Sequence, residues 1–215
     1  MNREAKLWLF GAGGVAVVVL AVVLIFGLNF APEFPNLYEE DGPTIQGTVA
    51  YMQYEHDDCV NVLDVGTGEA IEPYCDDWLW LEGWDQDGNL QILRGGGHSE
   101  ELLTLDPDTG AVLDSGEFRP DEDPRPEQPV AEAARRIRVS SQEGHATLSY
   151  RSGDSETILI DVDGSRVYGF GEYGVSADEK YAWTCDSEHR LLVVALDGTS
   201  GPWVVAEDVS ELRWK

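Results

Sequence analysis

The sequence predicts an all-β protein of about four repeat units, preceded by one N-terminal transmembrane helix. Three observations lead to this prediction. An uncharged apolar run occupies residues 7–29. After residue 45, short apolar stretches alternate with polar residues, which is the period of half-buried strands. Turns rich in aspartate and glycine separate these stretches and return at similar spacing, as in repeat architectures.

The apolar run at residues 7–29, LWLFGAGGVAVVVLAVVLIFGLN, is long enough to cross the ~30 Å hydrocarbon core of a bilayer as a helix. Arg3 and Lys6 precede it, and acidic residues follow it. The positive-inside rule then predicts a single-pass cell-membrane protein with residues 1–6 in the cytoplasm and the bulk of the chain outside. A cleaved signal peptide is the alternative, but its apolar region is usually about 7–15 residues long.

Two proline-rich stretches bound and interrupt the predicted domain. Residues 30–45 hold three prolines and few consecutive apolar residues, so we expect an extracytoplasmic tether there. The predicted domain comprises residues 46–215. Within it, residues 119–130 (RPDEDPRPEQPV) contain four prolines. Proline lacks the N–H that a sheet needs, so this stretch predicts an exposed loop.

Alternating apolar residues mark the strands of the domain. Val49 and Tyr51 form one such pair, and Ile158 and Ile160 form another. Side chains two positions apart lie on the same face of a strand, so each pair predicts one buried face. Residues 131–139 (AEAARRIRV) predict one short helical turn that runs into a strand.

The repeat consists of a first turn, two apolar strands and a second turn. The spacing between the two turns is nearly constant: 19 positions from Asp87 to Asp106, 20 from Glu143 to Asp163 and 19 from Asp178 to Asp197. An earlier, partial unit ends at Asp64, which lies 42 positions before Asp106. A period near 40 suits the four-stranded blade of a β-propeller.

About four such units predict a small or partial β-propeller. Four units close a ring if the C-terminal strand completes the first blade; otherwise they form an open, partial propeller. Residues 211–214 (ELRW) have the pattern of the start of a blade. The alternative fold is a two-sheet β-sandwich whose turns are alike.

Three segments carry a family resemblance. Residues 83–90 (GWDQDGNL) are similar to the W-S-P-D-G-x-x-[LI] signature of TolB-type and related bacterial propeller repeats. Residues 176–182 (SADEKYA) resemble S-P-D-G-K, and residues 192–198 (LVVALDG) resemble the strand and turn that follow it. Proline is missing from every S-P-D-G equivalent. The resemblance covers residues 46–214 and implies a propeller fold and protein–protein contact at the cell envelope.

The charge of the chain excludes one class of partner. The formal net charge is -27, from 41 acidic and 14 basic residues. Surfaces that bind nucleic acid need clustered lysine and arginine, so no nucleic-acid partner is expected. An acidic, solvated surface is the simplest interpretation, and salt adaptation of the source organism is another.

The three cysteines, Cys59, Cys75 and Cys185, all fall in the part predicted to lie outside the membrane, where disulfides persist. Cys59 and Cys75 flank one predicted turn, so we expect them to pair. Cys185 is then the odd cysteine, either buried or available to another chain.

Cofactor sites are weakly indicated. Asp106, Asp108 and Glu117 occupy positions 1, 3 and 12 of a calcium-type loop, but position 6 is Ala111 instead of glycine, and no flanking helices are expected. Calcium therefore stays an open alternative to a structural turn. His56 with its acidic neighbours, and His98 after a glycine run, lack the spacing of metal or phosphate sites.

The closely spaced Trp78, Trp80 and Trp84 are the candidate binding surface, because exposed indoles stack on ligands; filling the gaps between blades is the alternative. No assembled catalytic motif is present. We therefore expect a membrane-anchored binding or scaffold protein with a protein, peptide or glycan partner. An extracytoplasmic hydrolase or lyase that uses carboxylates or a metal is the alternative, and assembly with further chains is a third.

Overall fold

The computed structural model describes residues 32–39, 42–53, 59–95, 100–118, 132–142, 145–163 and 168–215. The predicted transmembrane helix at 7–29 and the proline-rich loop at 119–130 lie outside these ranges. Within them, no helix has the length and apolar character needed to cross a membrane.

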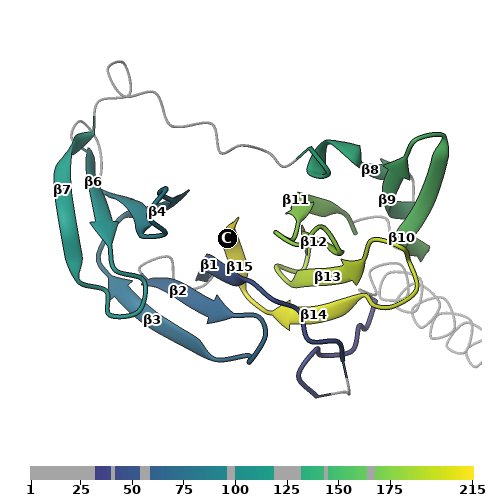
Figure 1. Cartoon of the computed structure of the whole chain (residues 1–215), viewed down its shortest axis with the longest axis horizontal. Coiled ribbons are helices and arrows are strands. Elements are labelled where there is room, and N and C mark those ends of the chain that lie inside the picture. The colour runs from purple at the N-terminus through teal and green to yellow at the C-terminus, as the bar shows by residue number, and fades with distance from the viewer. Residues whose placement is uncertain are drawn as a thin grey trace, which may run out of the picture.

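The described residues form four antiparallel sheets, shown in Figure 1. The first sheet has the strand order β15 (Val209–Trp214), β1 (Thr48–Gln53), β2 (Cys59–Asp64), β3 (Ala70–Cys75). The second contains β4 (Leu79–Trp84), β5 (Leu90–Arg94), β6 (Glu100–Leu105) and β7 (Val112–Phe118). The third contains β8 (Ile137–Gln142), β9 (His145–Ser152) and β10 (Ser155–Asp163). The fourth contains β11 (Phe170–Val175), β12 (Tyr181–Asp186), β13 (Leu191–Ala195) and β14 (Trp203–Ala206).

The sheets pack face to face in an arc, in the order second, first, fourth, third (Figure 1). The second and third sheets are neighbours in the sequence, yet they lie at opposite ends of the arc. The domain is therefore all-β and propeller-like, with four sheets instead of the two of a sandwich. The C-terminus lies near the middle of the arc, because the last strand, β15, pairs with the first strand, β1.

Three apolar layers hold the arc together, one at each junction between neighbouring sheets. The first sheet is covered on both faces. As a result, β1 buries four consecutive residues: Val49 and Tyr51 face the fourth sheet, while Ala50 and Met52 face the second. A strand buried on both faces loses the simple alternation that a half-buried strand shows.

The recurring turns share one backbone construction. Oδ1 of Asp64 accepts the N–H of Gly66 at 2.8 Å and that of Thr67 at 3.0 Å. Oδ1 of Asp106 accepts the N–H groups of Asp108 and Thr109 at 3.0 and 2.9 Å in the same way. Such aspartate-capped turns satisfy backbone donors locally, so the repeated aspartates have a structural role that explains their spacing.

Glycine closes one of these turns for a steric reason. Gly110 has a φ of 69°, and a Cβ at this position would lie 1.8 Å from the carbonyl oxygen of Pro73 in β3. The turn after β6 therefore rests directly on the outer strand of the first sheet.

The predicted helical turn is present in the structure, whereas the predicted tether is partly packed against the domain. The predicted helical turn is a 3₁₀ turn at Ala134–Arg136, followed directly by β8. The described part of the predicted tether contacts the domain: Leu37 donates its N–H to the carbonyl oxygen of Val204 in β14, and Leu37 and Ile45 are buried in the layer between the first and fourth sheets.

Candidate functional site

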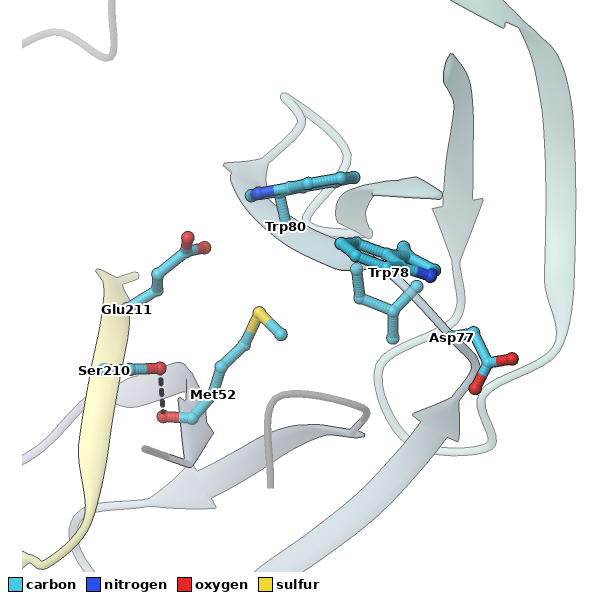
Figure 2. A pocket seen from close by; sticks show the side chains of 7 residues that line it. Met52, Asp77, Trp78, Trp80, Ser210 and Glu211 are labelled. Atoms are coloured by element: carbon cyan, nitrogen blue, oxygen red, sulfur yellow. Dashed lines mark hydrogen bonds between the residues drawn. The ribbon is translucent and has the colours of Figure 1, made fainter. Parts of the chain in front are cut away.

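A cavity of about 640 Å³ opens between the first and second sheets, where β4 and β15 begin. Its described lining residues are Met52, Asp77, Trp78, Leu79, Trp80, Ser210 and Glu211. Figure 2 shows the two indoles on one side of the cavity and the side chains from β1 and β15 on the other. The cavity therefore joins the connection between β3 and β4 to the C-terminal strand.

Trp78 is the most unusual residue of this cavity. Its side chain is 69% exposed, and its φ is 59°, in the left-handed region. A bulky residue in this region carries strain of about 1–3 kcal/mol and persists only where its surroundings impose the conformation. The carbonyl oxygen of Trp78 accepts the N–H of Gly95 at 3.0 Å, which fixes the backbone beside β5.

An arginine clamp fixes the residue two positions before Trp78. Nη1 of Arg94 lies 3.0 Å from Oδ2 of Asp76, and Nη2 lies 2.5 Å from Oε2 of Glu101. Tyr74 donates its hydroxyl to the same Asp76 oxygen at 3.2 Å. The hydrogen bonds from Arg94 hold the pKa of both carboxyl groups below their usual values, so both accept from Arg94 in the ionised form at neutral pH.

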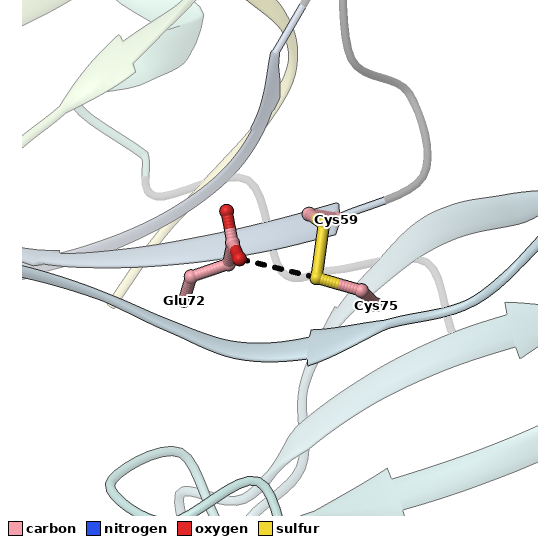
Figure 3. Close-up of side chains that lie close together, drawn as sticks. All are labelled: Cys59, Glu72 and Cys75. Carbon is pink, nitrogen blue, oxygen red and sulfur yellow. Dashed lines mark hydrogen bonds between the residues drawn. A yellow bond between two sulfur atoms is a disulfide. The ribbon is translucent and has the colours of Figure 1, made fainter.

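A disulfide joins Cys59 to Cys75, one position before this clamp (Figure 3). The two residues face each other in β2 and β3, with Cα atoms 4.1 Å apart and a sequence separation of 16 positions. In the chain-entropy model, a loop of this length contributes about 3 kcal/mol to stability. Oε1 of Glu72 lies 3.3 Å from Sγ of Cys75, but an oxidised sulfur carries no proton to donate.

Cys185 lies on β12 and is the free cysteine of the chain. Burial raises the pKa of its thiol to about 12, and the charges of Glu172 and Asp186 act in the same direction. The thiol is therefore protonated at neutral pH, and a protonated thiol is a poor nucleophile and metal ligand.

The three tryptophans of the candidate surface separate into two kinds. Trp78 and Trp80 line the cavity, whereas Trp84 fills the junction between sheets. Nε1 of Trp84 donates to the carbonyl oxygen of Arg213 at 3.2 Å, and Nζ of Lys215 lies 5.0 Å from its ring centroid.

Glu211 is the site residue that sequence reasoning missed. Its Oε2 accepts the N–H of Leu81 at 2.7 Å across 130 positions of sequence, so the carboxylate is held at the cavity by the backbone of β4. The blade-like pattern of residues 211–214 is the available signal, because it predicts a strand beside β1. Nothing in that pattern indicates which neighbouring side chains Glu211 meets.

Two of the residues considered for metals, His56 and His98, lie outside the described residues. A further histidine, His145 on β9, has its Nε2 3.3 Å from Oδ1 of Asp161. In the described part of the chain, one group of three metal-ligating side chains lies close together: Cys59, Glu72 and Cys75. The disulfide occupies both of its sulfur atoms.

Comparisons with known proteins give low similarity. TolB from Acinetobacter baumannii has a TM-score of 0.35 at 12% identity, over 80% of this chain and 67% of TolB. Hydrazine synthase from Kuenenia stuttgartiensis has a TM-score of 0.27 at 16% identity, over 70% of this chain and 50% of that chain. A candidate 6-phosphogluconolactonase from Bacteroides uniformis has a TM-score of 0.28 at 9% identity, over 77% and 68% of the two chains.

No family model and no curated protein matches the sequence. The similarity to TolB agrees with the resemblance of the turn residues. At these identities and TM-scores it does not bear on activity or partner, and the description of the fold rests on the four sheets themselves.

Proposed function

We propose that this chain is a single-pass, membrane-anchored binding or scaffold protein whose propeller-like domain, outside the membrane, holds a protein, peptide or glycan partner. Residues 7–29 support the anchor, since they are apolar, uncharged and preceded by Arg3 and Lys6. The cavity beside β4 and β15 supports the binding role.

One observation carries the binding role: Trp78 is 69% exposed and strained at φ 59° at the edge of a cavity of about 640 Å³. An indole exposed to water contributes little to folding, and a left-handed tryptophan opposes it. The disulfide and the Arg94 clamp nevertheless fix Cys75 and Asp76 just before it, and the hydrogen bond from Gly95 fixes its own carbonyl group. Rigid support of an unfavourable, exposed aromatic residue is expected of a preorganised binding surface.

The binding role predicts a separation of affinity from stability. The full chain, in a polyoxyethylene detergent that has neither sugar nor charge, is screened on arrays of peptides and glycans. For the ligands that the wild-type chain binds on these arrays, Trp78→Asn is expected to weaken binding about tenfold or more, as for a hot-spot aromatic residue. Asparagine tolerates left-handed backbone, so the variant is expected to unfold at the same or a slightly higher temperature. Leu113→Asn, at an exposed position of β7, is the matched control and is expected to leave binding unchanged. Ligands that bind wild type and Trp78→Asn equally would contradict this function.

The predicted topology has its own test. A full chain with a C-terminal epitope is produced in bacterial cells, and protease is added after the outer envelope is opened. We expect the chain in the membrane fraction and the epitope to be digested, while a cytosolic marker protein stays intact. A chain without residues 7–29 is expected to leave the membrane fraction. An epitope that survives the protease would contradict the extracytoplasmic location.

A further inference from the structure

The cavity between the first and second sheets contains negative charge and aromatic surface together. Its described lining residues include two carboxylates, from Asp77 and Glu211, and two indoles, from Trp78 and Trp80; none of them is basic. Arg94 is the nearby cation of the clamp, and Asp76 and Glu101 already neutralise it. A ligand that carries phosphate or carboxylate would face carboxylates in this cavity without a compensating charge, so anionic ligands are disfavoured.

A neutral ligand fits the lining less well than a cation. When a ligand covers Glu211, the carboxylate loses water, and among the described residues one protein donor, the N–H of Leu81, bonds to it. A neutral hydroxyl compensates part of that loss, whereas a cation also supplies the opposite charge. The face of an indole attracts a cation more strongly than any other side-chain ring does.

The described part of the chain has such a contact between a cation and a ring at two other places. Nζ of Lys215 lies 5.0 Å from the centroid of the Trp84 ring, and Cζ of Arg190 lies 5.3 Å from that of Phe34. Arg190 combines its aromatic contact with an ion pair to Asp186 at 2.6 Å. The cavity offers the same two partners, a ring face and a carboxylate, but with Trp78 exposed to solvent.

We propose that this cavity binds the side chain of a lysine or arginine presented by a protein or peptide partner. The inference rests on the proposed binding function and specifies its partner. The ammonium or guanidinium group lies between the indoles of Trp78 and Trp80 and the carboxylate of Glu211. A volume of about 640 Å³ accommodates such a side chain with part of its neighbours. The net charge of -27 steers basic partners toward the domain from a distance.

The test uses calorimetric titration of the full chain in the same uncharged detergent. The probe is an end-blocked peptide of alternating serine and lysine, and its counterpart carries an acetyl group on every lysine. Acetylation removes the charge and keeps the aliphatic part of the side chain, so we expect affinity to fall about tenfold or more. Higher salt is expected to weaken binding of the lysine peptide and to leave that of the acetylated peptide unchanged.

Two variants test which carboxylate the lysine peptide binds. Glu211→Gln keeps an oxygen that accepts the N–H of Leu81 and removes the charge, so it is expected to fold normally and to lose about fivefold or more in affinity for the lysine peptide. Asp154→Asn removes the same charge from an exposed turn between β9 and β10 and is expected to change affinity less than about twofold.

Three results would overturn the proposal. The first is that the acetylated peptide binds as well as the lysine peptide, and the second is that neither peptide binds. The third is that Asp154→Asn and Glu211→Gln weaken binding equally, which would indicate attraction to the acidic surface in general. In each case the proposed function is judged separately, because the array screen with Trp78→Asn includes neutral and acidic ligands.

Discussion

Ending the chain at Asp208 is expected to abolish cooperative folding of the propeller-like domain. The truncation removes β15, an edge strand of the first sheet that contacts both neighbouring sheets. On one side, Arg213 donates from Nε to the carbonyl oxygen of Glu82 in β4 at 3.1 Å. On the other side, the ring of Trp214 stacks on that of Trp183 in β12, with centroids 6.1 Å apart and planes at 8°.

Losing this strand also exposes the edge of β1 and one apolar layer. Val209 and Leu212 are 2% and 1% exposed and belong to the layer that joins the first sheet to the fourth. Without them the arc divides into two pairs of sheets, and a pair of small sheets buries too little apolar surface to fold well alone. The measurement is a urea unfolding curve with a limited-proteolysis time course, and we expect no cooperative transition and rapid cleavage.

Leu212→Ala tests the same effect with a smaller change. Replacing a buried leucine by alanine lowers the free energy of unfolding of a protein by about 2–5 kcal/mol. Val112→Ala, on the exposed edge strand β7 where valine is 51% exposed, is the matched control and is expected to change it by less than about 0.5 kcal/mol. If the chain that ends at Asp208 unfolds with the slope and midpoint of the full chain, β15 does not hold the sheets together.

The role of β15 shows how far the sequence predicts this fold. Residues 211–214 have the pattern of a strand that begins a blade, and the partial first unit lacks its first turn. One of the two alternatives drawn from the sequence, in which the C-terminal strand completes the first blade, predicts the β15–β1 ladder, and the structure has this ladder. Whether the four units close a ring could not be predicted in this way; the described sheets form an open arc, with the second and third sheets at its two ends. Turn residues specify each sheet, whereas the angle and contact between sheets depend on side chains that meet only in the folded chain.

Local irregularities limit the prediction of individual strands. Ile158 and Ile160 alternate in the sequence, and this alternation predicts a shared buried face. In β10 the register shifts between them, and Ile158 is 57% exposed while Ile160 is 3% exposed. A bulge inserts an extra residue into one strand and so reverses the facing of the residues after it, and no residue in this stretch indicates its position beforehand.

The candidate site, too, could be predicted from the sequence only in part. Trp78 and Trp80 could be singled out from the sequence, because clustered tryptophans are rare outside cores and binding surfaces. The left-handed φ of Trp78 could not, since the disulfide and the Arg94 clamp before it and the hydrogen bond from Gly95 form only in the folded chain. Glu211 reaches the cavity only because β15 pairs with β1, which is a long-range consequence of the fold.

Asp186→Ala is expected to destabilise the domain by about 3–5 kcal/mol, since it leaves a buried guanidinium without its counter-charge. The side chain of Asp186 is fully buried, and that of Arg190 is 15% exposed. Oδ2 of Asp186 accepts from Nε and Nη2 of Arg190 at 2.9 and 2.6 Å and from the hydroxyl of Tyr168 at 2.8 Å. Oδ1 accepts the N–H groups of Glu188 and Arg190.

This network also fixes the N-terminal segment to the fourth sheet. Nη1 of Arg190 donates to the carbonyl oxygen of Pro32 at 3.0 Å, and its guanidinium lies over the ring of Phe34. Burial opposes the charge of Arg190, but the hydrogen bonds that its guanidinium donates to Asp186 outweigh burial and raise the pKa of Arg190. Burial and the charge of Asp186 both raise the pKa of Tyr168, so its hydroxyl remains a donor.

Thermal unfolding and proteolysis of the full chain separate the two roles of Asp186, which are to cap its own turn and to pair with Arg190. Asp186→Asn keeps an oxygen for the turn N–H groups and is expected to lose less stability than Asp186→Ala. Asp197→Ala removes an exposed aspartate of the next turn, where Oδ1 accepts from Thr199, and is expected to cost less than about 1 kcal/mol. If Asp186→Ala and Asp197→Ala reduced stability equally, Asp186 would stabilise the domain through its turn alone and not through the ion pair with Arg190. If the ion pair matters, cleavage near Pro32 and Phe34 accelerates in Asp186→Ala before the sheets unfold, because the segment predicted as a tether is held to the domain through Arg190.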